Sequence, residues 1–121
     1  MAEEKAKEDC IFCKIARGEI KSEKILETDN FFAIKDINPK TKGHSLVISK
    51  KHYPTLLDVP SSMLGEFLET GKQIALKLLK EEKAEGFNLV INTYRVAGQL
   101  VPHVHLHILP RKKEDSFRMN V

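Results

Sequence analysis

One long stretch of the chain carries apolar residues at helical spacing. Between Pro60 and Lys83 they recur three and four positions apart, which predicts a helix over residues 61–83. Pro60 suits the first turn of a helix, and the serines that follow it can cap free backbone amides. The expected apolar face consists of Leu64, Phe67, Leu68, Ile74, Ala75, Leu78 and Leu79. Leu76 lies beside this face and widens it, so either one sheet buries the whole face or a second subunit covers part of it.

A different period appears near the end of the chain, where histidines alternate with aliphatic residues from His103 to Leu109. In an extended strand, successive side chains point to opposite faces. His103, His105 and His107 therefore share one face of a predicted strand, and the aliphatic side chains between them share the other. The aliphatic face anchors the strand in the core. Three imidazoles in a row add little to packing, so we expect the other face to carry chemistry.

Shorter apolar runs predict the remaining elements. Residues 25–27 and 31–35 flank a polar turn and indicate a hairpin, and residues 44–48 and 87–92 are expected to form two further strands. Residues 10–16 form a short amphipathic stretch that Gly18 can end as a helix stop. Because helices and strands do not alternate regularly, we expect an α+β fold: an antiparallel sheet of about five strands with one long and one short helix.

Length and composition restrict the class of protein. The chain has 121 residues, of which 41% are hydrophobic and 31% charged, which fits one soluble domain. We expect this domain to cover residues 10–115, between a flexible tail at 1–9 and a second tail at 116–121. The net charge of +3 favours anionic ligands without indicating a nucleic-acid surface. No apolar run is long enough to span a membrane or form a signal peptide, so we expect a cytoplasmic protein.

Cys10 and Cys13 are the only cysteines, and their CxxC spacing has several interpretations. In a reducing compartment this spacing indicates metal or redox use rather than a structural disulfide. A redox role is disfavoured because a redox CxxC normally opens a helix after a strand. The remaining alternative is two reduced, half-buried thiols on one side of a short helix, with Phe12 and Ile15 in the core.

Several short motifs together resemble the histidine triad family of nucleotide hydrolases and transferases. The resemblance covers residues 10–111 and is strongest to the Hint-like branch with its compact bacterial and archaeal members. The motifs that carry it are Cys10-Ile11-Phe12-Cys13, Lys35-Asp36-Ile37-Asn38-Pro39, Gly43-His44, Lys51-His52, Asn88 to Asn92, Ala97-Gly98-Gln99 and His103 to Leu109.

The resemblance implies a reaction and assigns roles to the histidines. The expected reaction is attack on the α-phosphorus of a purine nucleoside phosphoramidate through a covalent nucleotidyl-histidine intermediate, with release of an AMP-like product. His105 is the implied nucleophile, His107 donates to phosphate oxygens or the bridging atom, and His103 orients the site. An imidazole suits the first role because much of it is unprotonated at neutral pH.

The resemblance also implies the substrate contacts. Asp36 would bind the ribose hydroxyls and Ile37 would face the purine, although a loop aspartate such as Asp36 can equally cap a turn. The expected phosphate-side residues are His44, Asn92, Gly98, Gln99 and Leu100, partly through backbone amides. Phe32 on the hairpin is expected in the core rather than as a base platform.

Leu100 departs from the family pattern. Many Hint proteins have a hydroxyl residue directly after the Gly-Gln pair, where it donates toward the leaving group. The isobutyl group of Leu100 has no hydrogen to donate, so protonation of the leaving group falls to His107, water or another group.

For the cysteines, the resemblance implies structural zinc. In some prokaryotic relatives a CxxC pair binds zinc together with a Lys-His segment and the first triad histidine, which correspond to Cys10, Cys13, His52 and His103. Two thiolates and two imidazoles form a closed tetrahedral shell without an open position for Lewis-acid catalysis. No organic cofactor is expected.

Alternative functions stay open at this point. One is cleavage of dinucleoside polyphosphates, as in the Fhit-like branch of the family. A second is a metalloenzyme whose triad binds a catalytic metal, and a third is a nucleotide-binding regulatory protein with weak catalysis. The resemblance further implies a homodimer that uses the 61–83 helix and a sheet edge, with residues 116–121 near the partner's site.

Overall fold

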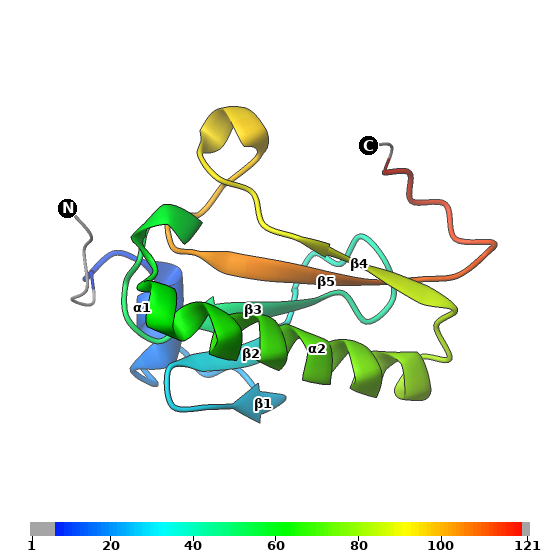
Figure 1. The fold of residues 1–121 in the computed structure, drawn as a ribbon, viewed down its shortest axis with the longest axis horizontal. Helices are drawn as coiled ribbons and strands as arrows, with labels where there is room; N and C mark the ends of the chain where they lie inside the picture. The colour runs from blue at the N-terminus through cyan, green and yellow to red at the C-terminus, as the bar shows by residue number, and fades with distance from the viewer. Residues whose placement is uncertain (1–6, 120–121) are drawn as a thin grey trace.

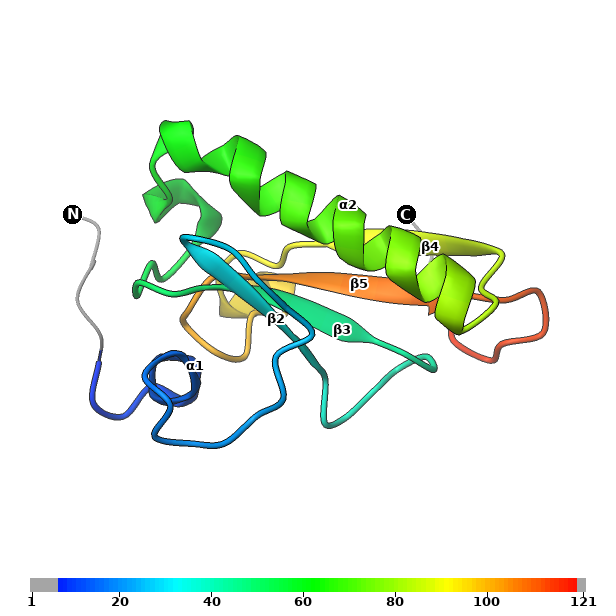
Figure 2. The same ribbon diagram turned by 90° about the horizontal axis from the view of Figure 1, so that it is seen from below.

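A computed structural model describes residues 7–119 and confirms the α+β architecture. Five strands form one antiparallel sheet in the order β1-β2-β3-β5-β4. They are β1 (Leu26–Glu27), β2 (Phe31–Lys35), β3 (Ser45–Ser49), β4 (Gly86–Val90) and β5 (His105–Arg111). The long helix α2 (Leu64–Glu81) covers one face of this sheet, and the short helix α1 (Ile11–Ala16) lies on the other (Figures 1 and 2).

The core has two layers, one on each side of the sheet. Between α2 and the sheet lie Phe31, Ala33, Val47, Phe67, Ile74, Leu78, Val104, Leu106 and Ile108 among others. Between α1 and the sheet lie Phe12, Ile15, Phe32, Ile34, Leu46 and Ile48. Phe32 is fully buried, which confirms its place in the core.

The long helix is shorter and narrower than predicted. Residues 61–63 form a 3-10 turn, α2 begins at Leu64, and Lys83 after its end has a left-handed φ of 54°. Leu64 and Leu68 were expected on the buried face but are 39% and 59% exposed. Thr70 and Gly71 are buried in their place, because the helix approaches the sheet closely there.

At Gly71 the helix α2 lies close to β5. A Cβ atom at this position would lie 2.5 Å from Cδ2 of Leu106, so no side chain larger than hydrogen fits without movement. Leu106 lies between His105 and His107 along β5, on the opposite face of the strand. The helix α2 therefore packs directly against the face of β5 that is opposite to the histidines.

Other boundaries shift by one or two residues. The hairpin is confirmed, β3 begins at Ser45 rather than His44, and β4 ends at Val90 rather than Asn92. The turn after α1 uses Gly18 with φ of 79°, and its amide donates to the Ile15 carbonyl. Strand β5 begins at His105, so His103 lies just before it. Pro102 lacks an N–H for the ladder, and the His103 amide donates to Val101 instead.

The expected tails lie partly outside the described residues, since 1–6 and 120–121 are not described. Arg111 organises the described part of the C-terminal segment: it donates to Asp115, to the Asn88 side chain and to the Phe117 carbonyl. Among residues 7–119, no helix has the length and apolarity that a membrane span requires.

Candidate active site and metal cluster

The sheet register places two of the triad histidines on the α1 side of the molecule. His105 pairs with Ile48 of β3, and His107 pairs with Leu46 of β3 and Val90 of β4. Because β5 is flanked by strands on both sides, its backbone is held along its length. His105 is buried and His107 is half-buried, so the row opens toward solvent at its His107 end.

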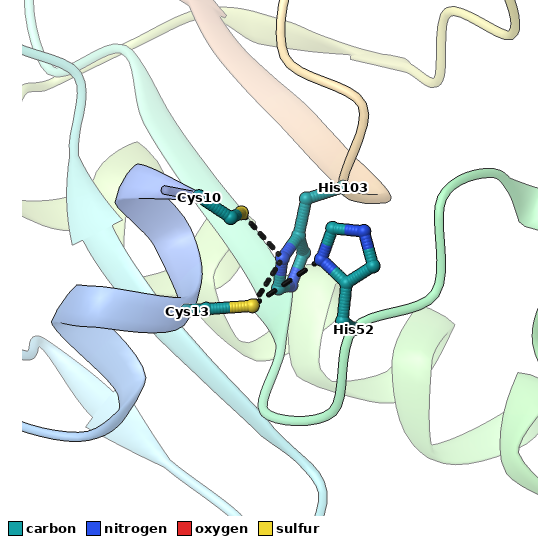
Figure 3. A group of neighbouring side chains, drawn as sticks. All are labelled: Cys10, Cys13, His52 and His103. Atoms are coloured by element: carbon teal, nitrogen blue, oxygen red, sulfur yellow. Dashed lines mark hydrogen bonds between the residues drawn. The ribbon is translucent and has the colours of Figure 1, made fainter. Parts of the chain in front are cut away.

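His103 belongs to a cluster of thiols and imidazoles at the other end of the row (Figure 3). Its Nδ1 lies 3.2 Å from Sγ of Cys10 and 3.5 Å from Sγ of Cys13, and Sγ of Cys13 lies 3.2 Å from Nδ1 of His52. The cysteines come from the start of α1, His52 from the segment after β3, and His103 from the residue pair before β5. These four residues form one group of candidate metal ligands.

The geometry of this cluster fits zinc. With Zn–S bonds of about 2.3 Å and Zn–N bonds of about 2.0–2.1 Å, a sulfur and a nitrogen in a tetrahedral shell stand about 3.5 Å apart. The distances in the cluster are close to this value. The Nε2–H of His103 donates to the Ser49 carbonyl at 2.8 Å, which leaves Nδ1 with a lone pair directed at the sulfurs. Burial lowers the pKa of His103 to about 4, which keeps this ring neutral.

His105 has one nitrogen held and the other unbound. Its Nδ1–H donates to the His103 carbonyl at 2.7 Å, whereas Nε2 makes no hydrogen bond to any residue in the range 7–119. This backbone acceptor fixes the tautomer that has its lone pair on Nε2. The Phe12 ring meets the imidazole edge-on, with centroids 5.1 Å apart. Burial lowers the pKa of His105, which favours the neutral form of the ring.

His107 has the opposite tautomer, because a chain of hydrogen bonds sets it. The Lys40 amide donates to Nδ1 of His44 at 3.1 Å, so the proton of neutral His44 is on Nε2. That Nε2 lies 3.0 Å from Nδ1 of His107, which must accept, and 3.4 Å from Oδ2 of Asp36. The proton of His107 is then on Nε2, where it is a donor. Burial lowers the pKa of His107 to about 4.

The expected nucleoside residues lie in the loop between β2 and β3, which extends from the sheet on the α1 side (Figure 2). The Asp36 amide donates to the His44 carbonyl at 2.9 Å, which ties this residue to the site. One oxygen of the Asp36 carboxylate accepts from the Asn38 amide at 2.9 Å, so the residue also caps a turn. Ile37 is 87% exposed. A carboxylate and an exposed apolar side chain are thus adjacent near His44, and their contacts to a ligand stay a prediction.

The expected phosphate-side residues lie in the segment from Asn92 to Val101, which we call the 92–101 loop. Gly98 has φ of 97°, and a Cβ atom there would lie 3.4 Å from Nδ2 of Asn92, so glycine lets the two residues pack closely. The Gly98 and Gln99 amides donate to Arg95 and Tyr94. Within residues 7–119 the Leu100 amide has no hydrogen-bond acceptor, so it is the amide of this trio that is available to a ligand.

Two of these side chains differ in exposure. Leu100 is 76% exposed, whereas Gln99 is buried and its side-chain amide hydrogen-bonds to backbone groups. The contribution of both residues to substrate binding stays a prediction.

Sequence reasoning missed three groups that set the chemistry of the row. The Ser49 carbonyl holds His103, the Lys40 amide starts the chain to His107, and Phe12 packs against His105. Backbone groups carry no residue-type signal, so only the fold reveals the first two. For Phe12 a signal existed, because it lies between the two cysteines in the sequence.

The fold and the site together define a class of protein: a small α+β domain whose reactive groups are imidazoles on a central strand, next to a thiol–imidazole cluster. Residues 17–114 match the HIT domain, and the chain belongs to this family. It is 43% identical to adenylylsulfatase HINT3 of Arabidopsis thaliana over 88% of this chain and 54% of that protein. It is 42% identical to adenosine 5'-monophosphoramidase HNT1 of Saccharomyces cerevisiae, over 88% of this chain and 65% of that protein. The chain thus spans about half and about two thirds of these relatives.

A solved structure supports the fold. A Zn-bound histidine triad family protein from Mycobacterium smegmatis superposes with a TM-score of 0.84 at 38% identity, covering 93% of this chain and 83% of that one.

Proposed function

We propose that this protein is a histidine triad hydrolase that cleaves purine nucleoside phosphoramidates at the α-phosphorus, with His105 as the nucleophile. The single observation that carries the proposal is the hydrogen bond from Nδ1–H of His105 to the His103 carbonyl, which leaves a lone pair on Nε2. The names of the Arabidopsis and yeast relatives, which refer to adenylyl and adenosine monophosphate derivatives, support the substrate class.

The reaction proceeds in two displacements. Nε2 of His105 donates its lone pair to phosphorus while the P–N bond to the leaving amine breaks, and the amine takes a proton as it departs. The Nε2–H of neutral His107 is the hydrogen-bond donor positioned for the leaving group or a phosphate oxygen, and the proton that the amine takes comes from a water molecule, which is left as hydroxide. A water then attacks phosphorus and gives one proton to the hydroxide left by the first step, the P–Nε2 bond breaks, and AMP leaves with neutral His105 restored.

Binding of the nucleotide would use the two loops beside the row. Asp36 accepts hydrogen bonds from the ribose hydroxyls and Ile37 lies against the purine. The Leu100 amide and the Asn92 side chain donate to phosphate oxygens, where negative charge grows in the transition state.

Zinc would have a structural role, held by Cys10, Cys13, His52 and His103. When bound, it would tie α1 to the segment after β3 and to the segment before β5, and it would fix the residue whose carbonyl holds His105. Metal analysis of protein prepared without added metal tests this role. We expect one equivalent of zinc, and a metal-free protein with reduced thiols would contradict it. Reduced thiols in such a cluster suit the cytoplasm, where we place the protein.

Assembly as a homodimer is the second structural proposal. Strand β4 is at the edge of the sheet, and α2 and β4 leave large apolar side chains exposed: Leu64, Leu68, Leu76, Phe87 and Leu89. An edge strand with apolar neighbours is a natural pairing surface. Light scattering at micromolar concentration is expected to give twice the chain mass, and a monomer would refute the dimer.

A second substrate class is favoured by Leu100. Its side chain donates no proton, and a mixed anhydride of AMP with an acid such as sulfate needs none, because sulfate leaves as a stable anion. The relative named adenylylsulfatase supports this candidate. Comparing turnover of adenylyl sulfate, a dinucleoside polyphosphate and adenosine phosphoramidate ranks the three classes.

The deciding experiment measures AMP release from adenosine 5'-phosphoramidate by wild type, His105→Ala and His103→Ala, with and without a chelator. We expect chelator-resistant activity in the wild type, none in His105→Ala and partial loss in His103→Ala. Activity that is lost to the chelator and equally to every triad variant would indicate a catalytic metal instead. AMP binding without turnover of any of the three substrate classes would indicate a regulatory protein.

A further inference from the structure

We propose that Gln99 is a positioning residue that joins the 92–101 loop to both histidine-bearing segments of the metal cluster. The inference deepens the proposed function and rests on it for its catalytic part. Gln99 is only 5% exposed although it belongs to a surface loop, and its amide makes three hydrogen bonds to backbone groups from three places in the chain.

The first of these bonds holds a strained residue. Tyr94 has φ of 73° and ψ of 157°, a conformation that is essentially restricted to glycine. Its N–H donates to Oε1 of Gln99 at 2.8 Å, and its carbonyl accepts from the Gln99 amide at 3.1 Å. Gln99 thus holds both backbone groups of Tyr94. Such strain persists only where the surroundings determine it, and here the Gln99 side chain holds the Tyr94 amide while the Gln99 and Ala97 amides hold the Tyr94 carbonyl.

The other two bonds reach the segments that carry the imidazoles of the cluster. Nε2 of Gln99 donates to the Pro54 carbonyl at 2.7 Å, two residues after His52. It also donates to the Val101 carbonyl at 3.1 Å, which accepts the His103 amide at 2.8 Å as well. One amide group therefore determines where the loop stands relative to His52 and His103. Through the His103 carbonyl it also affects the placement of His105.

This arrangement explains why an amide is needed at position 99. Glutamate would place negative charge against two carbonyl oxygens, and an apolar side chain of the same length would leave the Pro54 carbonyl and the Tyr94 amide without this partner. Displacement of the loop would move Asn92 and the Leu100 amide, which face the phosphate. A shift of about 1 Å can lower a catalytic rate by about a hundredfold. Asp36 and Ile37 lie on another loop, so nucleotide affinity is expected to change little.

The test compares Gln99→Met with wild type in the full-length, metal-loaded protein, using Gln73→Met as the matched control. Gln73 is an exposed glutamine on α2 whose amide bonds only Glu69. We expect Gln99→Met to lower kcat about 10- to 100-fold while the Kd for AMP changes less than threefold. The visible spectrum of the Co²⁺-substituted protein is expected to change, because His52 and His103 shift around the metal. Gln73→Met is expected to leave all three quantities unchanged.

A second substitution tests the proposal even if Gln99→Met is less stable than the wild type. Tyr94→Gly removes the conformational strain, so the double variant is expected to regain part of the lost kcat. Wild-type kcat and an unchanged Co²⁺ spectrum in Gln99→Met would overturn the proposal, as would a double variant no faster than Gln99→Met. If the wild type cleaves none of the substrates, the proposed function fails, and the Co²⁺ spectrum with its control still tests the structural link.

Discussion

The two ends of the histidine row use the same residue type for different purposes. At one end His103 is fully buried, and its ring lies between two thiols and a backbone carbonyl. At the other end His107 is half-buried and faces His44 and, through it, the loop of Asp36. Spacing along a strand places these imidazoles on one face, but the partner of one ring nitrogen decides what the other nitrogen does.

His105 stands between these ends and depends on the first. The His103 ring belongs to the cluster, and its carbonyl accepts the hydrogen bond that orients the His105 ring. We therefore call the His103 end the scaffold end and the His107 end the reactive end. We expect substitutions at the scaffold end to affect stability first, and substitutions at the reactive end to affect the catalytic rate first.

The largest effect is expected from His105→Ala. Removal of the nucleophile should lower kcat by about 10⁴-fold or more while the fold and AMP binding persist. Quenched-flow detection of a nucleotidyl-enzyme in the wild type, and its absence in the variant, checks the mechanism. His105→Ala with more than a tenth of wild-type kcat would remove this residue from the role.

Loss of the cluster should act on stability. In Cys13→Ser we expect the melting temperature to fall by about 10–20 °C, because a tightly bound metal stabilises the folded state by several kcal/mol. Differential scanning calorimetry with and without a chelator measures this. Lys14→Ser, the adjacent change outside the cluster, serves as the control. An equal melting temperature in Cys13→Ser and wild type would make the cluster dispensable.

The pH dependence should be set at the reactive end. Burial and the neighbouring histidines lower the pKa of His107 to about 4 from its ordinary value near 6.5. Between these values the unfolded chain binds the proton and the folded chain does not, so His107 contributes stability that is lost as the pH falls from 6.5 toward 4. We expect kcat/KM to stay flat from pH 8 to pH 6 and NMR to show a neutral ring at pH 6. A His107 ring that titrates near pH 6.5 would contradict the lowered pKa.

The smallest effect is expected from Leu100→Ser. A new hydroxyl can donate one hydrogen bond toward the leaving group, which is worth about a tenfold rate gain at most. The gain should appear with the phosphoramidate and not with adenylyl sulfate. Leu100→Ala controls for the loss of side-chain volume, and an equal gain with both substrates would show that Leu100 limits access instead.

The local pattern of apolar and polar residues was sufficient to predict much of the fold. Alternation predicted the faces of β5, and the spacing of apolar residues predicted α2, because both signals are local and come from burial on one side. Leu64 and Leu68 were misplaced because spacing alone does not reveal where a helix axis lies over a sheet. At Gly71 the helix comes so close that small residues occupy the interface and the leucines turn outward.

The residues of the candidate site could be predicted from the sequence, but most of the hydrogen bonds between them could not. Cys10, Cys13, His52 and His103 converge as the family resemblance implied. The hydrogen bonds that assign tautomers come from Ser49, Lys40 and the His103 backbone, and they depend on tertiary register. Gln99 was expected at the phosphate by its motif, and its inward amide became visible only once residues 54, 94 and 101 stood together.

The contact between Gly71 and Leu106 has a consequence for engineering this protein. Leu106 lies on the face of β5 opposite to His105 and His107, so any side chain introduced at position 71 would push against the back of the histidine strand. Substitutions at position 71 would therefore change the position of the histidines from the α2 side of the sheet, through a buried residue on the face away from the triad.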